Sequence, residues 1–170
     1  MQNGHCSDNV AAESSAGGAD NPADGKIPES IRNVLKGEKF GALATTAGNQ
    51  PHSTLVAVAP TPDLKRVLLA TPRSTRKFSN LQDNPRVSLL IDSVAQENVD
   101  FEQACAVTAV GTAREITHQQ RERFLELYLG RHPALRDFVR SPSCALIEID
   151  VDVYYLARHF QEVMEWHLKS

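Results

Sequence analysis

Short apolar runs joined by tight turns are the feature that most constrains the fold of this chain. The turns Gly48-Asn49 and Pro60-Thr61-Pro62-Asp63 connect successive runs within a few residues. Because parallel strands need crossovers of a dozen or more residues, these turns favour antiparallel pairing. We therefore expect an antiparallel sheet that closes into a barrel, with an α/β fold as the main alternative. The runs typical of strands are 40–46, 52–59, 66–70, 86–92, 104–116, 144–149 and 153–157.

Helical patterns are interleaved with these runs. Pro28 suits the first position of one helix, and Thr117 with Gln120 forms a capping-box pattern before another helix, which Gly130 can end. In the longest strand, the interior Gly111 predicts a bulge or a close approach of two backbones. The helices are expected at about 28–37, 74–82, 117–130 and 133–139, with a terminal helix at 159–168.

The first 25 residues differ in composition from the rest of the chain. They carry four acidic side chains and no basic one, with Met1 and Val10 as the only larger apolar residues. Such a segment cannot bury enough apolar surface to offset the entropy cost of ordering. We therefore expect a disordered tail at 1–25 and a single domain at 26–170. Outside the tail the charge is close to neutral, which argues against a general nucleic-acid-binding role.

Membrane and metal sites are also poorly supported. No apolar run approaches the ~18 residues of a spanning helix, and the N-terminus lacks the apolar region of a secretory signal. The cysteines Cys6, Cys105 and Cys144 form no C-x-x-C pair, and the last two lie in strand-like runs. We expect both to be buried thiols in a cytoplasmic protein without a structural metal.

Residues 71–77, Thr-Pro-Arg-Ser-Thr-Arg-Lys, carry the strongest functional signal because they open a short helix after an apolar strand. A helix N-terminus offers unpaired N–H groups and the positive end of a dipole. Ser74 can cap the helix and Thr75 can donate a hydroxyl. Arg76 and Lys77 add two positive charges, which oppose the dipole by roughly 0.3–1 kcal/mol each when exposed. A bound phosphate would offset this cost; the alternative is a solvated helix face.

This segment continues into Asn84-Pro85-Arg86-Val87-Ser88-Leu89-Leu90, and the pattern resembles the FMN-binding split-barrel proteins related to pyridoxamine 5′-phosphate oxidase. The segments 50–56 and 110–116 also look similar and occur in the expected order. The resemblance covers about residues 28–157. It implies a mainly β fold with α (α+β), namely a six- to seven-stranded antiparallel split β-barrel with flanking helices. It also implies a homodimer with FMN at the subunit interface.

The resemblance further implies which residues contact FMN. The start of the helix would bind the phosphate, and an early strand would run along the flavin ring through its main chain. One late tyrosine would lie against the flavin of the partner subunit. The phosphate residues would be Thr75, Arg76 and Lys77, with Ala70 and Thr71 beside them. The strand along the ring would contribute His52, Ser53, Thr54 and Leu55. The late tyrosine would be Tyr155. No catalytic residue is identified, and His52 is interpreted as a strand residue near the ring.

The chain departs from the oxidase at several positions. Thr54 and Ala59 stand where the oxidase has an arginine and a lysine, and Ala106 stands where it has a glutamine. These differences argue against oxidation of vitamin B6. They leave an FMN-dependent oxidoreductase that acts on an unidentified small substrate.

Three alternatives remain open. One is a non-enzymatic flavin carrier or electron-transfer module, and another is a deazaflavin-binding relative with a similar fold. The third is a haem-binding split barrel with His159 or His167 as the axial ligand. Motifs of other enzyme classes, such as H-E-x-x-H, the P-loop and G-x-G-x-x-G, do not occur in the sequence.

Overall fold

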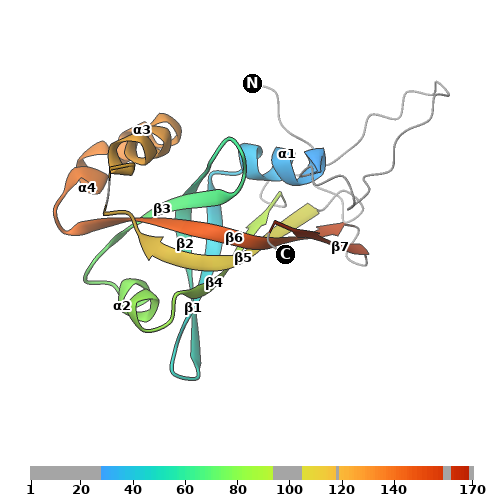
Figure 1. The fold of residues 1–170 in the computed structure, drawn as a ribbon, viewed down its shortest axis with the longest axis horizontal. Coiled ribbons are helices and arrows are strands. Elements are labelled where there is room, and N and C mark those ends of the chain that lie inside the picture. The colour runs from blue at the N-terminus through green and yellow to red at the C-terminus, as the bar shows by residue number, and fades with distance from the viewer. Residues whose placement is uncertain (1–27, 94–104, 118, 159–161, 169–170) are drawn as a thin grey trace.

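The computed structural model describes residues 28–93, 105–117, 119–158 and 162–168 and shows an antiparallel barrel with helices around it (Figure 1). The strand order is β3-β2-β1-β4-β5-β6-β7, and β3 also pairs with β6. Six strands therefore close into a barrel and β7 is an extra strand, which confirms the predicted split-barrel class. The strands are β1 Phe40–Ala47, β2 Gln50–Pro60, β3 Arg66–Pro72, β4 Arg86–Asp92, β5 Cys105–Glu115, β6 Cys144–Arg158 and β7 Glu162–His167.

The helices before β6 agree with the predicted positions to within a few residues. They are α1 Glu29–Gly37, α2 Arg76–Asp83, α3 Arg121–Arg131 and α4 Arg136–Arg140, with the 3-10 helix η3 Pro133–Leu135 before α4. Among the described residues, no helix is long and apolar enough to cross a membrane. The predicted tail at 1–25 lies outside the described residues.

The C-terminal part of the chain differs from the predictions in two ways: the break between its two strands is absent, and the terminal helix is a strand. The runs 144–149 and 153–157 form one strand of 15 residues, β6. The segment predicted as a terminal helix contains the strand β7, which pairs with β6 over Val153–Arg158. The apolar residues in this segment fitted a helical stripe, but the open edge of β6 offers backbone hydrogen bonds that a local pattern does not reveal. In the strand, Trp166 is buried while Val163 is exposed.

Two helix starts also differ from the predictions. Pro28 is the N-cap of α1 rather than its first helical residue. The capping box at Thr117 does not form, because α3 begins after Gln120, which makes no side-chain cap hydrogen bond. The N–H of Ile116 donates to the Leu146 carbonyl of β6, and residues 119–120 form a turn immediately before the helix. At the other end, α3 continues past Gly130 to Arg131.

The barrel has one core inside and a second core on its outer surface. Alternate residues of a strand point to opposite faces of the sheet, so Val67 and Leu69 of β3 face the inside while Leu68 faces out. The inner core also contains residues of α1 and Leu81 of α2. The outer core packs α3 and α4 against β2, β3 and β6, with Tyr128 at its centre.

A bulge in the longest sheet pairing confirms the prediction for Gly111. The pairing of β5 with β6 shifts between Val110 and Gly111. A Cβ atom at Gly111 would lie 2.3 Å from the carbonyl oxygen of Asp150, so only glycine permits this approach. The prediction for the cysteines is only half correct: Cys144 is a buried thiol, whereas Cys105 is disulfide-bonded.

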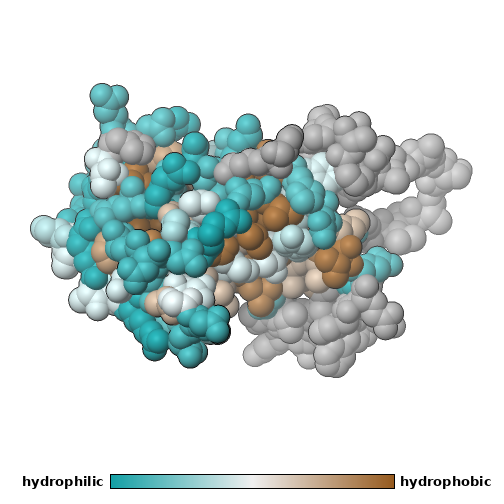
Figure 2. Space-filling model, turned by 60° about the horizontal axis from the view of Figure 1, so that its bottom comes forward, coloured by the Kyte–Doolittle hydropathy of each residue, from teal (hydrophilic) through white to brown (hydrophobic). Residues whose placement is uncertain are grey.

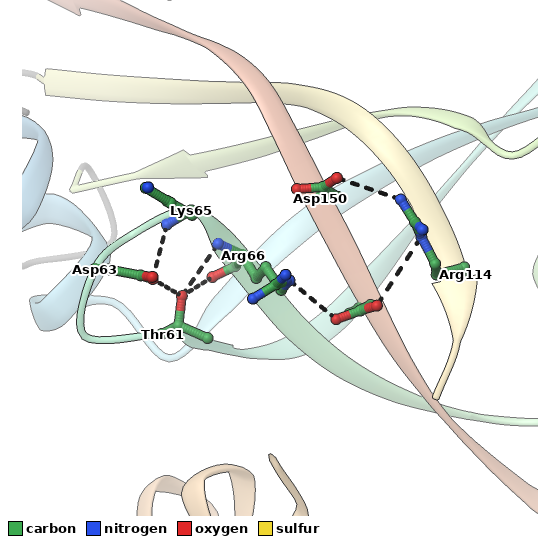
Figure 3. Close-up of polar contacts among 7 residues, drawn as sticks. Thr61, Asp63, Lys65, Arg66, Arg114 and Asp150 are labelled. Carbon is green, nitrogen blue, oxygen red and sulfur yellow. Dashed lines mark hydrogen bonds and ion pairs between the residues drawn. The ribbon is translucent and has the colours of Figure 1, made fainter. Parts of the chain in front are cut away.

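Ion pairs cross the seam where β3 meets β6 and closes the barrel. Arg66 of β3 lies 3.2 Å and Arg114 of β5 lies 3.9 Å from the carboxylate of Glu148, which is only 6% exposed. Figure 3 shows Arg114 also reaching Asp150, at 3.2 Å. We call Arg66, Arg114, Glu148 and Asp150 the seam cluster. It joins three strands and leaves neither arginine without a carboxylate.

Candidate cofactor site

The loop between β3 and α2 is held by two threonine hydroxyls. Thr75 is the N-cap of α2, one residue later than the cap predicted at Ser74. Its hydroxyl accepts from the Phe78 N–H at 3.4 Å, donates to the Pro72 carbonyl at 2.8 Å and lies 3.0 Å from the Thr71 hydroxyl. Ser74 is exposed instead, because the chain turns one residue later than the pattern indicated.

The first turn of α2 carries positive charge that the described protein does not neutralise. Arg76 is exposed and Lys77 is half-buried. Neither has a hydrogen bond or ion pair with any residue in the described part of the chain, and the first turn of α2 contains no acidic residue. The first N–H groups of a helix also have no intrahelical acceptor. The start of α2 can therefore accept an anion without displacing an existing contact.

Arg73 lies in the same loop, but its charge is used by the protein itself. Its guanidinium makes two hydrogen bonds to Glu115, at 2.7 and 2.5 Å, and lies over the ring of Phe78 at 5.5 Å. Its main-chain N–H donates to the Ser143 carbonyl at 2.8 Å. The sequence gives no local sign of this structural role for Arg73. Its role depends on Glu115, which is distant in sequence.

The strand residues predicted along the flavin ring lie on a hairpin with one open edge. From Gln50 to Ala57, β2 pairs with β1, and its pairing with β3 is confined to Val58–Pro60. Leu55 is 72% exposed. The Thr54 hydroxyl is buried and has no hydrogen-bond partner, although buried hydroxyls are normally satisfied. An orphaned hydroxyl beside an open strand edge fits a site that a ligand completes.

A buried chain of hydrogen bonds connects this hairpin to α2. The Asn80 side-chain N–H donates to the Thr45 hydroxyl at 3.0 Å, and that hydroxyl donates to the His52 carbonyl at 3.3 Å. Asn80 and Thr45 are 3% and 2% exposed. The structure therefore connects two segments that were identified separately in the sequence. Neither residue could be identified from the sequence, since a single polar residue in a helix or a strand gives no sign of its burial.

Tyr155 lies far from this site within one chain. Thr71 pairs with Ala145 of β6, and Tyr155 follows ten residues further along that strand, a separation of about 30 Å at ~3.3 Å per residue. Because β3 pairs with β6 and closes the barrel, the strands of Leu55 and Tyr155 are separated by β3 on one side and by β1, β4 and β5 on the other. Within one chain, Tyr155 therefore lies near the opposite end of β6 from the residues that pair with the end of β3.

Ala70 lies beside Thr71, but its main chain has a partner within the protein. The Tyr128 hydroxyl hydrogen-bonds to the backbone of Ala70 and donates to the Ala57 carbonyl at 3.4 Å. Tyr128 thus bridges β2 and β3 beyond the point where their pairing ends. Burial raises the pKa of this hydroxyl and keeps it neutral. The predicted contact of Ala70 with a phosphate stays a prediction.

Within the described ranges, other candidates for a site are metal-ligating side chains, the haem-ligand candidate His167 and a further cavity. No group of three or more metal-ligating side chains occurs among the described residues. His167 is exposed and lies 3.1 Å from Glu165, while His159 lies outside the described residues. A cavity of about 220 Å³ lies between the β2–β3 turn and the start of α3. Its lining includes Thr61 and Phe124, and it is separate from α2 and the β2 hairpin.

Comparison with known protein families gives one extended match. A family model described as pyridoxamine 5′-phosphate oxidase matches residues 27–157. A curated protein of Schizosaccharomyces pombe, described as a pyridoxamine 5′-phosphate oxidase homolog, is 34% identical over 74 residues. This alignment covers 39% of the chain and 39% of that relative, so the chain spans well under two thirds of the relative's length.

Solved structures share the fold at low sequence identity. A haem-binding protein from Mycobacterium smegmatis has a TM-score of 0.74 and 16% identity over 88% of this chain and 59% of its own. HutZ, described as a haem storage protein of Vibrio cholerae, has a TM-score of 0.65 and 14% identity over 82% of this chain and 94% of its own. The match of the family model to most of the sequence, on a barrel of this topology, shows that the chain belongs to the pyridoxamine 5′-phosphate oxidase family.

Proposed function

We propose that this protein binds FMN and acts as a flavin-dependent oxidoreductase on a small substrate. The observation that carries the proposal is the start of α2, where two cations have no carboxylate among the described residues and the helix cap is held by Thr71 and Thr75. Membership of the family supports a flavin as the cofactor. The orphaned Thr54 hydroxyl on the neighbouring hairpin supports a ligand that extends beyond the phosphate.

Each part of the site has a distinct task in this proposal. Arg76 and Lys77 bind the phosphate together with the helix N–H groups, and Thr75, whose hydroxyl donates to the Pro72 carbonyl, holds the start of the helix in place. The open edge of β2 from His52 to Leu55 binds the ring through main-chain groups. The flavin supplies the redox chemistry when bound, and the protein orients it and limits its exposure to water.

A second copy of the chain would complete the site. Leu55, Ala42, Leu90, Thr108 and Tyr155 pair in turn across β2, β1, β4, β5 and β6, so their side chains share the outer face of the sheet. Leu90 is 40% exposed and the neighbouring Phe40 is 56% exposed. Figure 2 shows apolar side chains exposed among hydrophilic ones on one face of the molecule.

Two-fold pairing through this outer face places different residues of the two subunits together. In a two-fold dimer the same patch contacts itself, so Tyr155 of one copy can approach the β2 strand of the other. This arrangement resolves the separation of Tyr155 from α2 within one chain. We therefore propose a homodimer with FMN at its interface, to which each subunit contributes.

The absorption spectrum of the purified protein and FMN titration test the cofactor. We expect a flavin spectrum, and we expect Arg76→Ala with Lys77→Ala to weaken FMN binding by roughly 10- to 100-fold, because two charge-assisted contacts are lost. Riboflavin binding should change by less than about twofold, since riboflavin lacks the phosphate. The matched control, Arg121→Ala with Arg123→Ala, removes two cations from the first turn of α3 and should change neither affinity. Equal losses for FMN and riboflavin would reject the phosphate role.

Sedimentation of a surface variant tests the dimer. Leu90→Asp places a charge on the proposed interface, and we expect monomers with weakened FMN binding. Phe138→Asp is the control, because Phe138 is a similarly exposed apolar residue on α4, away from the outer face of β1 and β4. A dimer that resists Leu90→Asp but dissociates with Phe138→Asp would place the interface elsewhere.

Haem binding is the second candidate, because two solved structures with this fold are described as haem proteins. The same spectrum separates the two cofactors, since haem and flavin absorb differently. Turnover with candidate substrates then separates an oxidoreductase from a flavin carrier, which exchanges electrons with a partner but shows no substrate-dependent rate.

A further inference from the structure

The buried chain Asn80–Thr45–His52 ends on a main-chain group of the proposed flavin strand. Thr45 is the central link, because its hydroxyl accepts from Asn80 and donates to the His52 carbonyl. The side chains of Asn80 and Thr45 are almost fully buried, so water cannot replace either hydrogen bond at low cost. Neither side chain lies on the open edge of β2. Their effect on a ligand must therefore pass through the backbone of the hairpin.

The His52 carbonyl fixes the direction of the next N–H group. A trans peptide is planar, with its C=O and N–H pointing in opposite directions. Since the His52 carbonyl points toward Thr45 of β1, the Ser53 N–H points away from β1. That side of β2 has no strand partner at Ser53 within the described residues, because the pairing with β3 begins at Val58. The Ser53 N–H is thus presented at the open edge.

We infer that Asn80 and Thr45 are positioning residues that orient the Ser53 N–H as a hydrogen-bond donor to the flavin ring. The inference rests on the proposed function, because it assumes that the open edge of β2 faces a flavin. It also explains why a polar pair is buried at the junction of α2 and the hairpin. The pair sets the orientation of the ring strand relative to the helix that holds the phosphate.

The test uses the full-length protein with riboflavin and FMN as probes. Thr45→Val keeps the shape of the side chain and removes the hydroxyl, whereas Thr45→Ser keeps the hydroxyl. We expect Thr45→Val to weaken binding of riboflavin and FMN by the same factor, about tenfold, and to shift the absorption bands of the bound flavin. Thr45→Ser should restore wild-type affinity and bands. Ser93→Ala, which removes another buried hydroxyl at the far end of β4, controls for loss of stability alone.

A second measurement needs no variant. Exchange of the Ser53 amide hydrogen should be fast in the free protein and should slow when riboflavin is added. Equal affinities and spectra for Thr45→Val and Thr45→Ser, or unchanged Ser53 exchange with riboflavin bound, would overturn the inference. Failure of the proposed function has a different signature, because the wild-type protein would then bind neither riboflavin nor FMN.

Discussion

The cations of the seam cluster and those at the start of α2 are the same residue types in opposite electrostatic settings. Arg66 and Arg114 both approach the buried carboxylate of Glu148. Arg76 and Lys77 have no carboxylate partner in the described part of the chain, although they oppose the dipole of their own helix. The seam cations therefore stabilise the closed barrel, while the α2 cations cost stability unless an anion binds.

This difference shows how a binding site can be separated from structural charge. The number of cations does not distinguish the seam cluster from the start of α2, since each holds two. What distinguishes them is whether carboxylates of the protein neutralise these cations. The same difference occurs within a single loop. Arg73 lies three residues before Arg76, yet its guanidinium is neutralised by Glu115 through hydrogen bonds of 2.5 and 2.7 Å.

The largest expected effect follows from breaking the seam cluster. Glu148→Gln removes the charge that Arg66 and Arg114 share, and we expect the free energy of unfolding to fall by about 2 kcal/mol, less than for a fully buried pair because both arginines are partly exposed. Urea denaturation measures this change. Glu122→Gln is the control, since its pair with Arg140 at 3.4 Å is exposed and should contribute less than about 0.5 kcal/mol. FMN affinity should stay unchanged in both variants.

At the start of α2, we expect substitution to change the free energy of unfolding in the opposite direction from Glu148→Gln. Without ligand, Arg76→Ala with Lys77→Ala should leave the free energy of unfolding unchanged or raise it by up to about 1 kcal/mol, because the cations no longer oppose the helix dipole. Thermal unfolding with and without FMN measures this, and the stabilisation by FMN should shrink in the variant. If the ligand-free variant loses as much stability as Glu148→Gln, the two cations are structural and the comparison fails.

The smallest effect concerns a basic side chain that the fold keeps neutral. Burial lowers the pKa of His132, and its ring donates to the Val58 carbonyl at 2.9 Å. Below about pH 6.5 the unfolded chain takes up a proton that the folded chain resists, so stability should fall as the pH decreases. His132→Gln should flatten this dependence in urea titrations at several pH values. If the pH dependence of the free energy of unfolding persists unchanged in His132→Gln, other groups cause it. His167→Gln, at an exposed site, serves as the control.

The start of α2 could be found from sequence because its signals are local. A strand, a capping hydroxyl and two cations follow one another within eight residues, and the family pattern around them predicted that the bound group is the phosphate of FMN. The exact cap was wrong by one residue, at Ser74 instead of Thr75, since hydrogen bonds to Thr71 and Pro72 decide which hydroxyl turns inward.

Features that depend on distant partners were not predictable. The apolar stripe near Trp166 fitted a helix, but the open edge of β6 made it a strand. Asn80 and Glu148 look like ordinary surface residues in the sequence, and each is buried only because a residue far along the chain meets it.

The sequence by itself determined the first five strands, the glycine bulge at Gly111 and the cationic start of α2, because periodicity, backbone freedom and helix capping act over a few residues. Only the tertiary structure decided which charges are neutralised, which edges are open and how the hairpin is oriented toward α2. These depend on contacts between strands and helices that closing the barrel brings together, and a local pattern holds no information about such partners.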